Sequence, residues 1–394
     1  MKKIIRNATF IILLVSILLC WAGCNKQDEN EGAGSNSSTG SDEKVISIDT
    51  GKYNAETDAQ SFFIWGSVAQ TKNGFYFLSG QKILFYDVAS KQIVPLCNRP
   101  NCSHDYREAQ DCNASLMGND SIAMSYDRLT IQYHEGYLYI SGCDHEGYDC
   151  IYKISQDGST REKYMKLYRS GMTNTATESY RRSPSFLIHR GYVYYINEME
   201  ETQVIRRMQM GTDDAEVVYT PQGERATVYR MKAYGDYLVF QTGNFAEDMI
   251  NIEARICAYN VKTGEIGTIV EDVYNEYHIF DGKVYYTTQS EIRCYDMKTK
   301  EDVAIIEGNN GYYAFCLDDT YIYTFEDGGI LRVYTHDGEI KCTVADESVS
   351  SLYYVYDGYL LSDIPTQDKI KFGVIEITDF KDGDATWEIF EYKY

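Results

Sequence analysis

The sequence predicts an all-β protein, a single seven-bladed β-propeller of four-stranded antiparallel blades. Three observations support this class. A sequence repeat of four short aromatic runs, separated by Gly or polar turns, recurs along the chain. Within the runs Tyr, Val, Ile and Phe alternate with polar residues, which is typical of half-buried strands. Only 5 of the 394 residues are Pro, and scarce proline suits many hydrogen-bonded strands.

The clearest copy of the repeat spans residues 277–306. Tyr277–Phe280 precedes an Asp-Gly turn, and the runs Lys283–Thr287, Ile292–Tyr295 and Val303–Ile306 follow. Four such runs match the size of a propeller blade. A turn glycine marks the same place in six copies, and Asp319-Thr320 takes that place in a seventh. The six glycines are Gly74, Gly136, Gly191, Gly235, Gly282 and Gly358.

The two ends of the repeat bear on the number of blades. The first copy begins at Phe62–Trp65 and the last ends at Trp387–Phe390, so each terminal blade is expected to be complete. An eight-bladed fold is the alternative. It would need an added strand at Val45–Ile48, or a short extra unit within Ser115–Leu129.

The N-terminal segment has the pattern of a bacterial lipoprotein signal. Three cations among residues 1–6 precede the apolar run Phe10–Leu19, which is too short to span a membrane. The small pair Ala22-Gly23 then precedes Cys24, the expected lipidation site. A diacylglycerol thioether on this cysteine would supply two chains, palmitate among them, and anchor the protein stably. Ordinary cleavage and release is the alternative.

Three segments follow from this interpretation. Residues 1–23 form the expected signal peptide, residues 24–58 the lipidated cysteine and a flexible polar linker, and residues 59–394 the propeller. The expected location is the extracytoplasmic face of a bacterial cell membrane. A formal net charge of −22 excludes a nucleic-acid partner, because polyanions would be repelled.

Six cysteines and histidines form the most specific candidate site. They are Cys97, Cys102, His104, Cys112, Cys143 and Cys150. The first four lie on the connection after blade one, and the last two flank a loop of blade two. Three thiolates and one imidazole could close a tetrahedral zinc site. Disulfides compete with a metal outside the membrane: Cys143–Cys150 across a hairpin, and one bridge among the first three cysteines. Free thiols are the third possibility.

The Cys-rich phrase Leu96-Cys97-Asn-Arg-Pro-Asn-Cys102-Ser-His104, followed by Cys112-Asn-Ala114, resembles uncharacterised members of a propeller-type family. These are secreted lipoproteins of Gram-positive bacteria, a domain of unknown function related to the propeller of the Tol-system periplasmic protein. The resemblance covers the chain after the linker. It implies a propeller fold and an extracytoplasmic location, and no activity.

The long loops are expected on one face of the propeller. In each blade the connections after the second and fourth strands share a face, and loops held by a rigid scaffold usually carry binding. The candidate binding residues on these loops are Asp105, Tyr106, His145, Tyr148, Glu200, Glu201, Phe245, Glu247 and Asp248.

No established catalytic motif occurs in the sequence. A phosphate-binding Gly loop, a Gly-x-Ser-x-Gly elbow and a His-Glu-x-x-His pair are all missing. The sequence therefore favours a non-enzymatic, monomeric interaction module for a peptide, glycan or partner protein. The alternatives are a propeller hydrolase or lyase acting on a surface polysaccharide, and a Cys/His metal or redox sensor.

Overall fold

The structure is a computed structural model of the chain. It describes residues 58, 68–79, 82–104, 112–116, 129–144, 146–169, 185–196, 203–223, 226–245, 252–307, 314–326, 330–345, 351–356, 359–365, 370–376 and 388–391. The chain divides into two compact units, Met1–Asp42 and Glu43–Tyr394, and every described residue belongs to the second. No helix within these residues is long and apolar enough to cross a membrane.

The described strands form seven four-stranded sheets, each antiparallel and built from consecutive strands. Blade 1 contains β1 Val68–Thr71, β2 Gly74–Ser79, β3 Lys82–Asp87 and β4 Gln92–Pro95. Blade 2 contains β5 Ile131–His134, β6 Tyr137–Cys143, β7 Tyr148–Ser155 and β8 Arg161–Arg169. Blade 3 contains β9 Ser185–His189, β10 Tyr192–Ile196, β11 Ile205–Gln209 and β12 Ala215–Tyr219. Blade 4 contains β13 Ala226–Tyr234, β14 Tyr237–Phe245, β15 Ile252–Asn260 and β16 Ile266–Val273.

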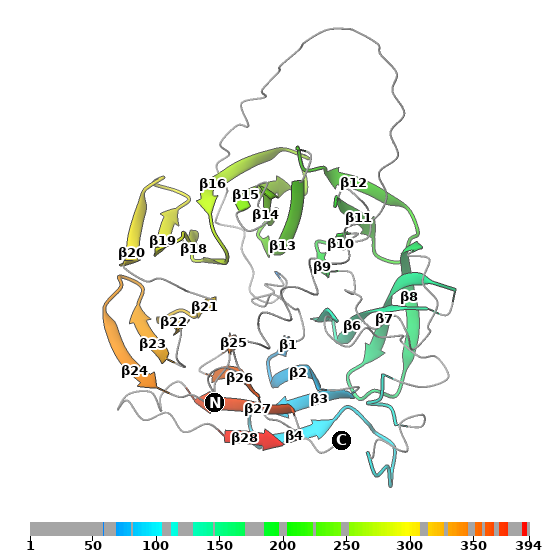
Figure 1. Ribbon diagram of the computed structural model, residues 1–394. Coiled ribbons are helices and arrows are strands. Elements are labelled where there is room, and N and C mark those ends of the chain that lie inside the picture. The colour runs from blue at the N-terminus through cyan, green and yellow to red at the C-terminus, as the bar shows by residue number, and fades with distance from the viewer. Residues whose placement is uncertain are drawn as a thin grey trace, which may run out of the picture. The chain divides into compact units, whose positions relative to one another are not determined.

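The remaining sheets continue the pattern. Blade 5 contains β17 Tyr277–Phe280, β18 Lys283–Thr287, β19 Glu291–Asp296 and β20 Asp302–Glu307. Blade 6 contains β21 Ala314–Leu317, β22 Tyr321–Glu326, β23 Ile330–Thr335 and β24 Ile340–Ala345. Blade 7 contains β25 Ser351–Tyr356, β26 Tyr359–Pro365, β27 Ile370–Glu376 and β28 Glu388–Glu391. The sheets stand around a ring, with the first strand of each towards the centre (Figure 1). The predicted all-β propeller class agrees with this arrangement.

Two details of the predicted blades are wrong. The described residues form no eighth sheet. Ser115, which the eight-bladed alternative placed in an extra unit, forms an isolated bridge with Lys82 of blade 1. The first strand of blade 1 is Val68–Thr71, which pairs with β2 through a tight turn, and not Phe62–Trp65. Phe62–Trp65 and Val45–Ile48 lie outside the described residues.

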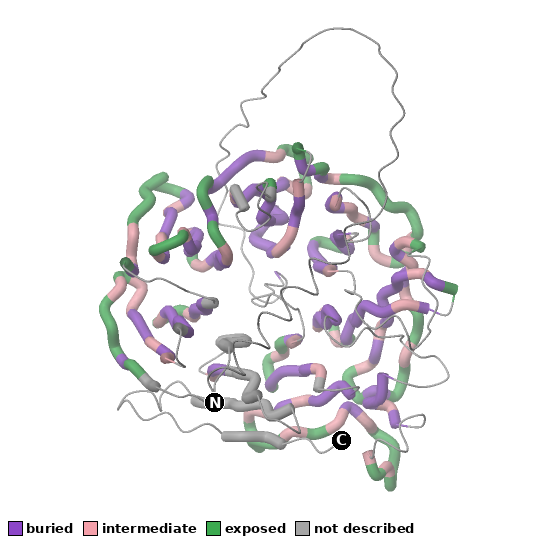
Figure 2. The backbone as a smooth tube through the Cα atoms, in the orientation of Figure 1, coloured by how far each residue is buried: buried purple, intermediate pink, exposed green. Residues whose placement is uncertain are grey.

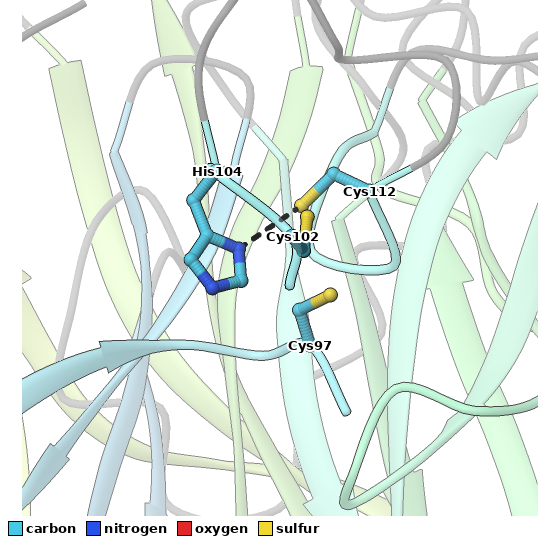
Figure 3. A group of neighbouring side chains, drawn as sticks. All are labelled: Cys97, Cys102, His104 and Cys112. Carbon is cyan, nitrogen blue, oxygen red and sulfur yellow. Dashed lines mark hydrogen bonds between the residues drawn. The ribbon is translucent and has the colours of Figure 1, made fainter. Parts of the chain in front are cut away.

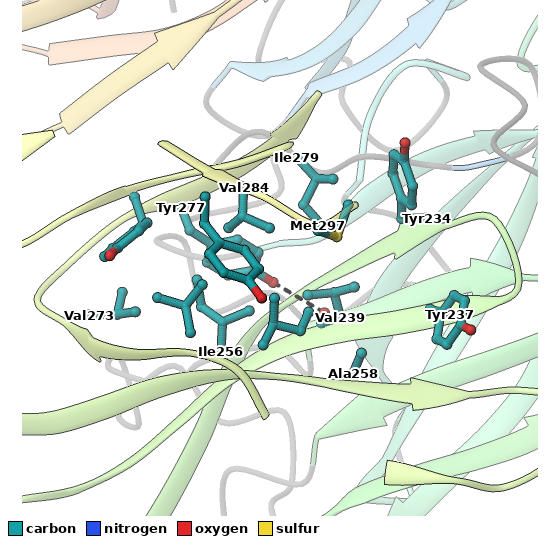
Figure 4. Packing of buried hydrophobic residues seen from close by; sticks show 14 residues of the cluster. Tyr234, Tyr237, Val239, Ile256, Ala258, Val273, Tyr277, Ile279, Val284 and Met297 are labelled. Carbon is teal, nitrogen blue, oxygen red and sulfur yellow. Dashed lines mark hydrogen bonds between the residues drawn. The ribbon is translucent and has the colours of Figure 1, made fainter. Parts of the chain in front are cut away.

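The core lies between neighbouring blades. The strands nearest the centre are mostly buried, and the outermost strands are largely exposed (Figure 2). Between blades 4 and 5, Val239 and Ile256 pack with Tyr277 and Val284 in one buried cluster (Figure 4). The hydroxyl of Tyr277 donates to the backbone carbonyl of Val239 over 3.1 Å, so the polar end of this buried ring is paired. Many of the tyrosines therefore serve inter-blade packing.

Blades 1 and 7 touch, which closes the ring. The rings of Tyr86 in β3 and Tyr359 in β26 meet edge to face with 6.4 Å between centroids. Both terminal sheets consist of consecutive strands, so none of the described strands is exchanged between the first blade and the last.

Asp58, which the sequence places in the linker, is buried against blades 3 and 4. Its carboxylate accepts the backbone N–H of Gly235 over 2.8 Å and lies 3.3 Å from the guanidinium of Arg190. His189 is buried beside it, with 3.8 Å between Nδ1 and the carboxylate. The ordered contacts of the chain therefore begin before the first strand.

Candidate metal centre

The Cys-rich connection leaves and rejoins blade 1 at the same strand, β3. Ile83 accepts the backbone N–H of Leu96 over 3.0 Å and donates its own N–H to the carbonyl of Ala114 over 2.9 Å. Cys97 directly follows the first contact, and Cys112 comes shortly before the second. Pairing with one residue of β3 therefore brings together two cysteines that lie far apart in the chain.

The side chains of Cys97, Cys102, His104 and Cys112 converge (Figure 3). Their ligand atoms all lie within 4.8 Å of one another, and Cys112 Sγ lies 3.6 Å from His104 Nδ1. Zn–S bonds of about 2.3 Å and Zn–N bonds of about 2.0 Å in a tetrahedron separate ligand atoms by roughly 3.5–3.8 Å. The donor set and its spacing therefore fit a zinc ion.

Left-handed backbone at two positions shapes the loop that carries these side chains. Asn101 has φ 61° and His104 has φ 54°, a conformation that non-Gly residues adopt infrequently. The ammonium of Lys82 donates a hydrogen bond to the carbonyl of His104, which holds the loop to the start of β3. The loop is thus fixed by contacts on both sides of the cluster.

The electrostatics of the cluster differ from residue to residue. Burial opposes ionisation of the Cys97 thiol, yet the backbone N–H groups of Arg99 and Asn113 donate to its sulfur and bring its pKa below the ordinary value. Burial raises the pKa of Cys112 to about 11. Burial, together with the nearby Lys82 ammonium, lowers the pKa of His104, which favours the neutral imidazole that metals bind.

Cys143 and Cys150 do not join this cluster. In the β6–β7 ladder Cys143 faces Asp149, and Gly142 faces Cys150. Because successive strand residues point to opposite faces, the two cysteines project from opposite sides of the ladder, and the predicted bridge between them is not formed. Both thiols hydrogen-bond to Asp144 instead: Cys143 to its carbonyl over 3.5 Å, and Cys150 to its carboxylate over 3.7 Å.

No described cysteine forms a disulfide. This holds for all nine, from Cys97 to Cys342. Four of them lie buried within strands: Cys257, Cys294, Cys316 and Cys342.

The cluster sits at the junction of blades 1 and 2, on the outer rim of the ring (Figure 1). The amide of Asn98 donates to Asp157 in the β7–β8 turn over 3.0 Å. The guanidinium of Arg161 in β8 donates to the carbonyls of Ser115 and Asn113 over 2.8 and 2.9 Å.

Most of the predicted binding residues lie outside the part of the chain that the structure describes. Tyr148 begins β7, and the ammonium of Lys166 lies 4.4 Å from its ring centroid, so this ring already has a cationic neighbour. Phe245 ends β14. The other candidates lie outside the described residues, as does Cys24: Asp105, Tyr106, His145, Glu200, Glu201, Glu247 and Asp248.

Sequence reasoning missed the backbone donors to the sulfur atoms. The N–H groups of Arg99 and Ala114, each two residues after a cysteine, donate to Cys97 and Cys112. Such donors carry no residue-type signal, because every non-proline residue has a backbone N–H. The one sequence signal that could have indicated these backbone donors is that a turn follows both cysteines.

Comparison with known proteins supports the fold and gives no family. No protein-family model matches the chain, and no curated protein matches it. Among solved structures, a prolyl endopeptidase matches with TM-score 0.54 and 13% identity over 84% of this chain and 51% of its own. A puromycin hydrolase matches with TM-score 0.53 and 8% identity over 87% and 55%. TolB from Acinetobacter baumannii matches with TM-score 0.40 and 12% identity over 83% and 78%.

These likenesses concern the architecture alone. The chain spans about half the length of the prolyl endopeptidase and the puromycin hydrolase. At such low identities a shared fold carries no activity with it. The matches with TM-scores above 0.5 thus support the fold and show no family for this chain.

Proposed function

We propose that this protein is a non-enzymatic β-propeller interaction module, lipid-anchored on Cys24 at the extracytoplasmic face, with one structural Zn²⁺ ion at the junction of blades 1 and 2. The observation that carries the proposal is the convergence of Cys97, Cys102, His104 and Cys112 within 4.8 Å. The signal pattern of residues 1–24 supports the anchor and the location.

The donor set argues for a structural ion. Four protein ligands complete the tetrahedral coordination of zinc and leave no open position for a substrate, whereas catalytic zinc sites keep one position free. Zinc has no redox chemistry of its own. These features favour a metal that holds the chain in place over the sensor and hydrolase alternatives.

The position of the cluster suggests what the ion would hold. Between Cys97 and Cys112 the chain leaves the blade 1 sheet, and on its return Asn113 and Ser115 accept hydrogen bonds from Arg161 of blade 2. An ion bound by residues on both sides of this excursion would fix the contact between two blades. Its binding free energy would then add to the stability of the fold.

A metal analysis of the intact protein tests this proposal. Full-length protein purified from membranes without chelators should contain one zinc per chain, and its N-terminal peptide should carry acyl chains on Cys24. The Cys112→Ala variant should lose the zinc, while Cys257→Ala, which removes a buried thiol far from the cluster, should keep it. Metal-free protein with bridged cysteines would contradict the zinc proposal, and an unmodified Cys24 would contradict the anchor.

A further inference from the structure

A groove of about 430 Å³ lies between the last strand of blade 4 and the strands of blade 5. Its apolar and aromatic lining comes from Ile269, Val270, Tyr286 and Tyr295, all of which are largely buried. Volumes of this size are typical of sites that hold a ligand or a few side chains. The groove is separate from the Cys/His cluster, which lies between blades 1 and 2.

Two exposed carboxylates rim the groove on the side of blade 4. Pairing of β15 with β16 jumps from Ile256–Val270 to Ala254–Val273, so β16 carries an extra residue there. Asp272 in this bulge has a left-handed φ of 58°, and both Glu271 and Asp272 are exposed. Neither forms an ion pair with another described residue, and bulges commonly redirect side chains at functional edges.

The groove has an excess of negative charge. Its one guanidinium, on Arg293, already bonds to Glu291 over 2.7 Å and to Asp302 over 3.2 Å. Four carboxylates therefore face a single cation, and the two of blade 4 remain without one. Within the described residues these carboxylates do not converge closely enough to form a metal-ligand group. The charge thus suits an extended organic cation better than a metal ion.

We propose that this groove receives a Lys- or Arg-containing segment of a partner protein. The proposal rests on the function proposed above and names the chemistry of the partner. The charged tip of a long basic side chain can meet the carboxylates of Glu271 and Asp272 at the rim of the groove.

An exposed aromatic ring beside the groove also points to a protein partner. Tyr274, two residues after Asp272, is 47% exposed. Its backbone N–H donates to the carbonyl of Thr287 over 2.8 Å, which places it next to Thr288 of the groove lining. Exposed tyrosines are enriched where proteins bind proteins.

Calorimetric titration of the full-length, zinc-loaded protein with acetyl-tetra-arginine amide tests the proposal. The double variant Glu271→Gln/Asp272→Asn should bind the peptide at least about five-fold more weakly, given the modest worth of each exposed ion pair. The matched control is Asp213→Asn/Asp214→Asn, which removes an exposed acidic pair from blade 3 with the same change in net charge. That control should stay within about two-fold of the unmodified protein.

Three outcomes would overturn the inference. The peptide could fail to bind, or the two double variants could weaken it equally, which would reduce the effect to the overall charge of −22. Spermine could bind as tightly as the peptide with the same dependence on Glu271 and Asp272, which would make a small polyamine the occupant. Zinc content measured on the same samples reports separately on the proposed function, because neither double variant touches the Cys/His cluster.

Discussion

Gly158→Ala should destabilise the protein more than the same change at Gly264, and it alone should weaken the metal centre. The two glycines occupy equivalent turns before the last strands of blades 2 and 4, with φ 72° and 75°. A Cβ in this left-handed region costs about 1 kcal/mol at either position. At Gly264 the added Cβ would meet nothing within 4 Å, so the conformational cost is the whole effect there.

At Gly158 the added carbon has no room. It would overlap the carbonyl oxygen of Leu96 and lie 3.3 Å from the Cβ of Asn113. Because an obstacle made of backbone cannot rotate away, overpacking should add roughly 1–3 kcal/mol. Leu96 and Asn113 adjoin Cys97 and Cys112, so relief of the overlap should move two zinc ligands. Zinc affinity should then fall on the order of ten-fold, as when groups that support metal ligands are changed.

Urea unfolding in the presence of zinc and a competitive zinc titration give the two readouts. The expected loss of unfolding free energy is about 2–4 kcal/mol for Gly158→Ala and about 1 kcal/mol for Gly264→Ala. Equal losses for the two variants would refute the argued contact between the β7–β8 turn and the Cys-rich connection. An unchanged zinc affinity in Gly158→Ala would refute the link between that contact and the cluster.

Three further predictions concern residues away from that turn. Asp58→Ala should lower the unfolding free energy by about 2–4 kcal/mol, because it leaves the N–H of Gly235 unpaired and removes the closer of the two buried carboxylates beside Arg190; thermal melting checks this. His189 should make the fold acid-sensitive. Burial lowers its pKa to about 4, so its stabilising effect is complete above pH 6.5 and is lost as the pH falls towards 4, by up to about 3 kcal/mol. Urea unfolding at pH 7 and pH 5 with His189→Gln as control should show this loss only in the unmodified protein. Tyr277→Phe should cost about 1–2 kcal/mol, because the carbonyls of Arg230 and Val239 lose the hydroxyl donor that they share.

Each of these predictions has a result that would contradict it. A melting temperature unchanged in Asp58→Ala would mean that the Asp58 carboxylate contributes nothing to the stability of the fold. An identical pH dependence with and without His189 would assign the acid sensitivity to other groups. Tyr277→Phe at full stability would mean that water replaces the lost donor.

The propeller class could be predicted because the strand pattern repeats through the chain. Alternating apolar residues and recurrent turn glycines such as Gly282 are local signals, and one blade confirms the next. The ends of the repeat were harder to place. The aromatic run Phe62–Trp65 has the composition of a strand, but the first described strand of blade 1 is Val68–Thr71, and composition alone does not show which run pairs with β2.

The candidate site was predictable in part for the same reason. The types of Cys97, Cys102, His104 and Cys112 left a metal site, disulfides and free thiols open, and their convergence depends on the pairing of Leu96 and Ala114 with a single residue of β3. Whether Cys150 joins the Cys/His cluster depends on the register of its strand, because a shift of one residue moves a side chain to the opposite face of the sheet. No sequence pattern fixes that register.

The groove between blades 4 and 5 carried no signal in the sequence. It depends on the extra residue in β16 near Asp272, and acidic residues are so frequent in this chain that no pair of them stands out. The burial of Asp58 could not be predicted either, because an acidic residue at the end of a polar linker does not differ in type from the residues around it.

X-ray absorption at the zinc edge of full-length protein tests the central claim most directly. The account predicts one zinc per chain with three sulfur ligands at about 2.3 Å and one nitrogen at about 2.0 Å, reduced to two sulfurs in Cys112→Ala if any zinc remains. A first shell of oxygen and nitrogen only, or protein free of zinc with its cysteines joined in disulfides, would contradict it.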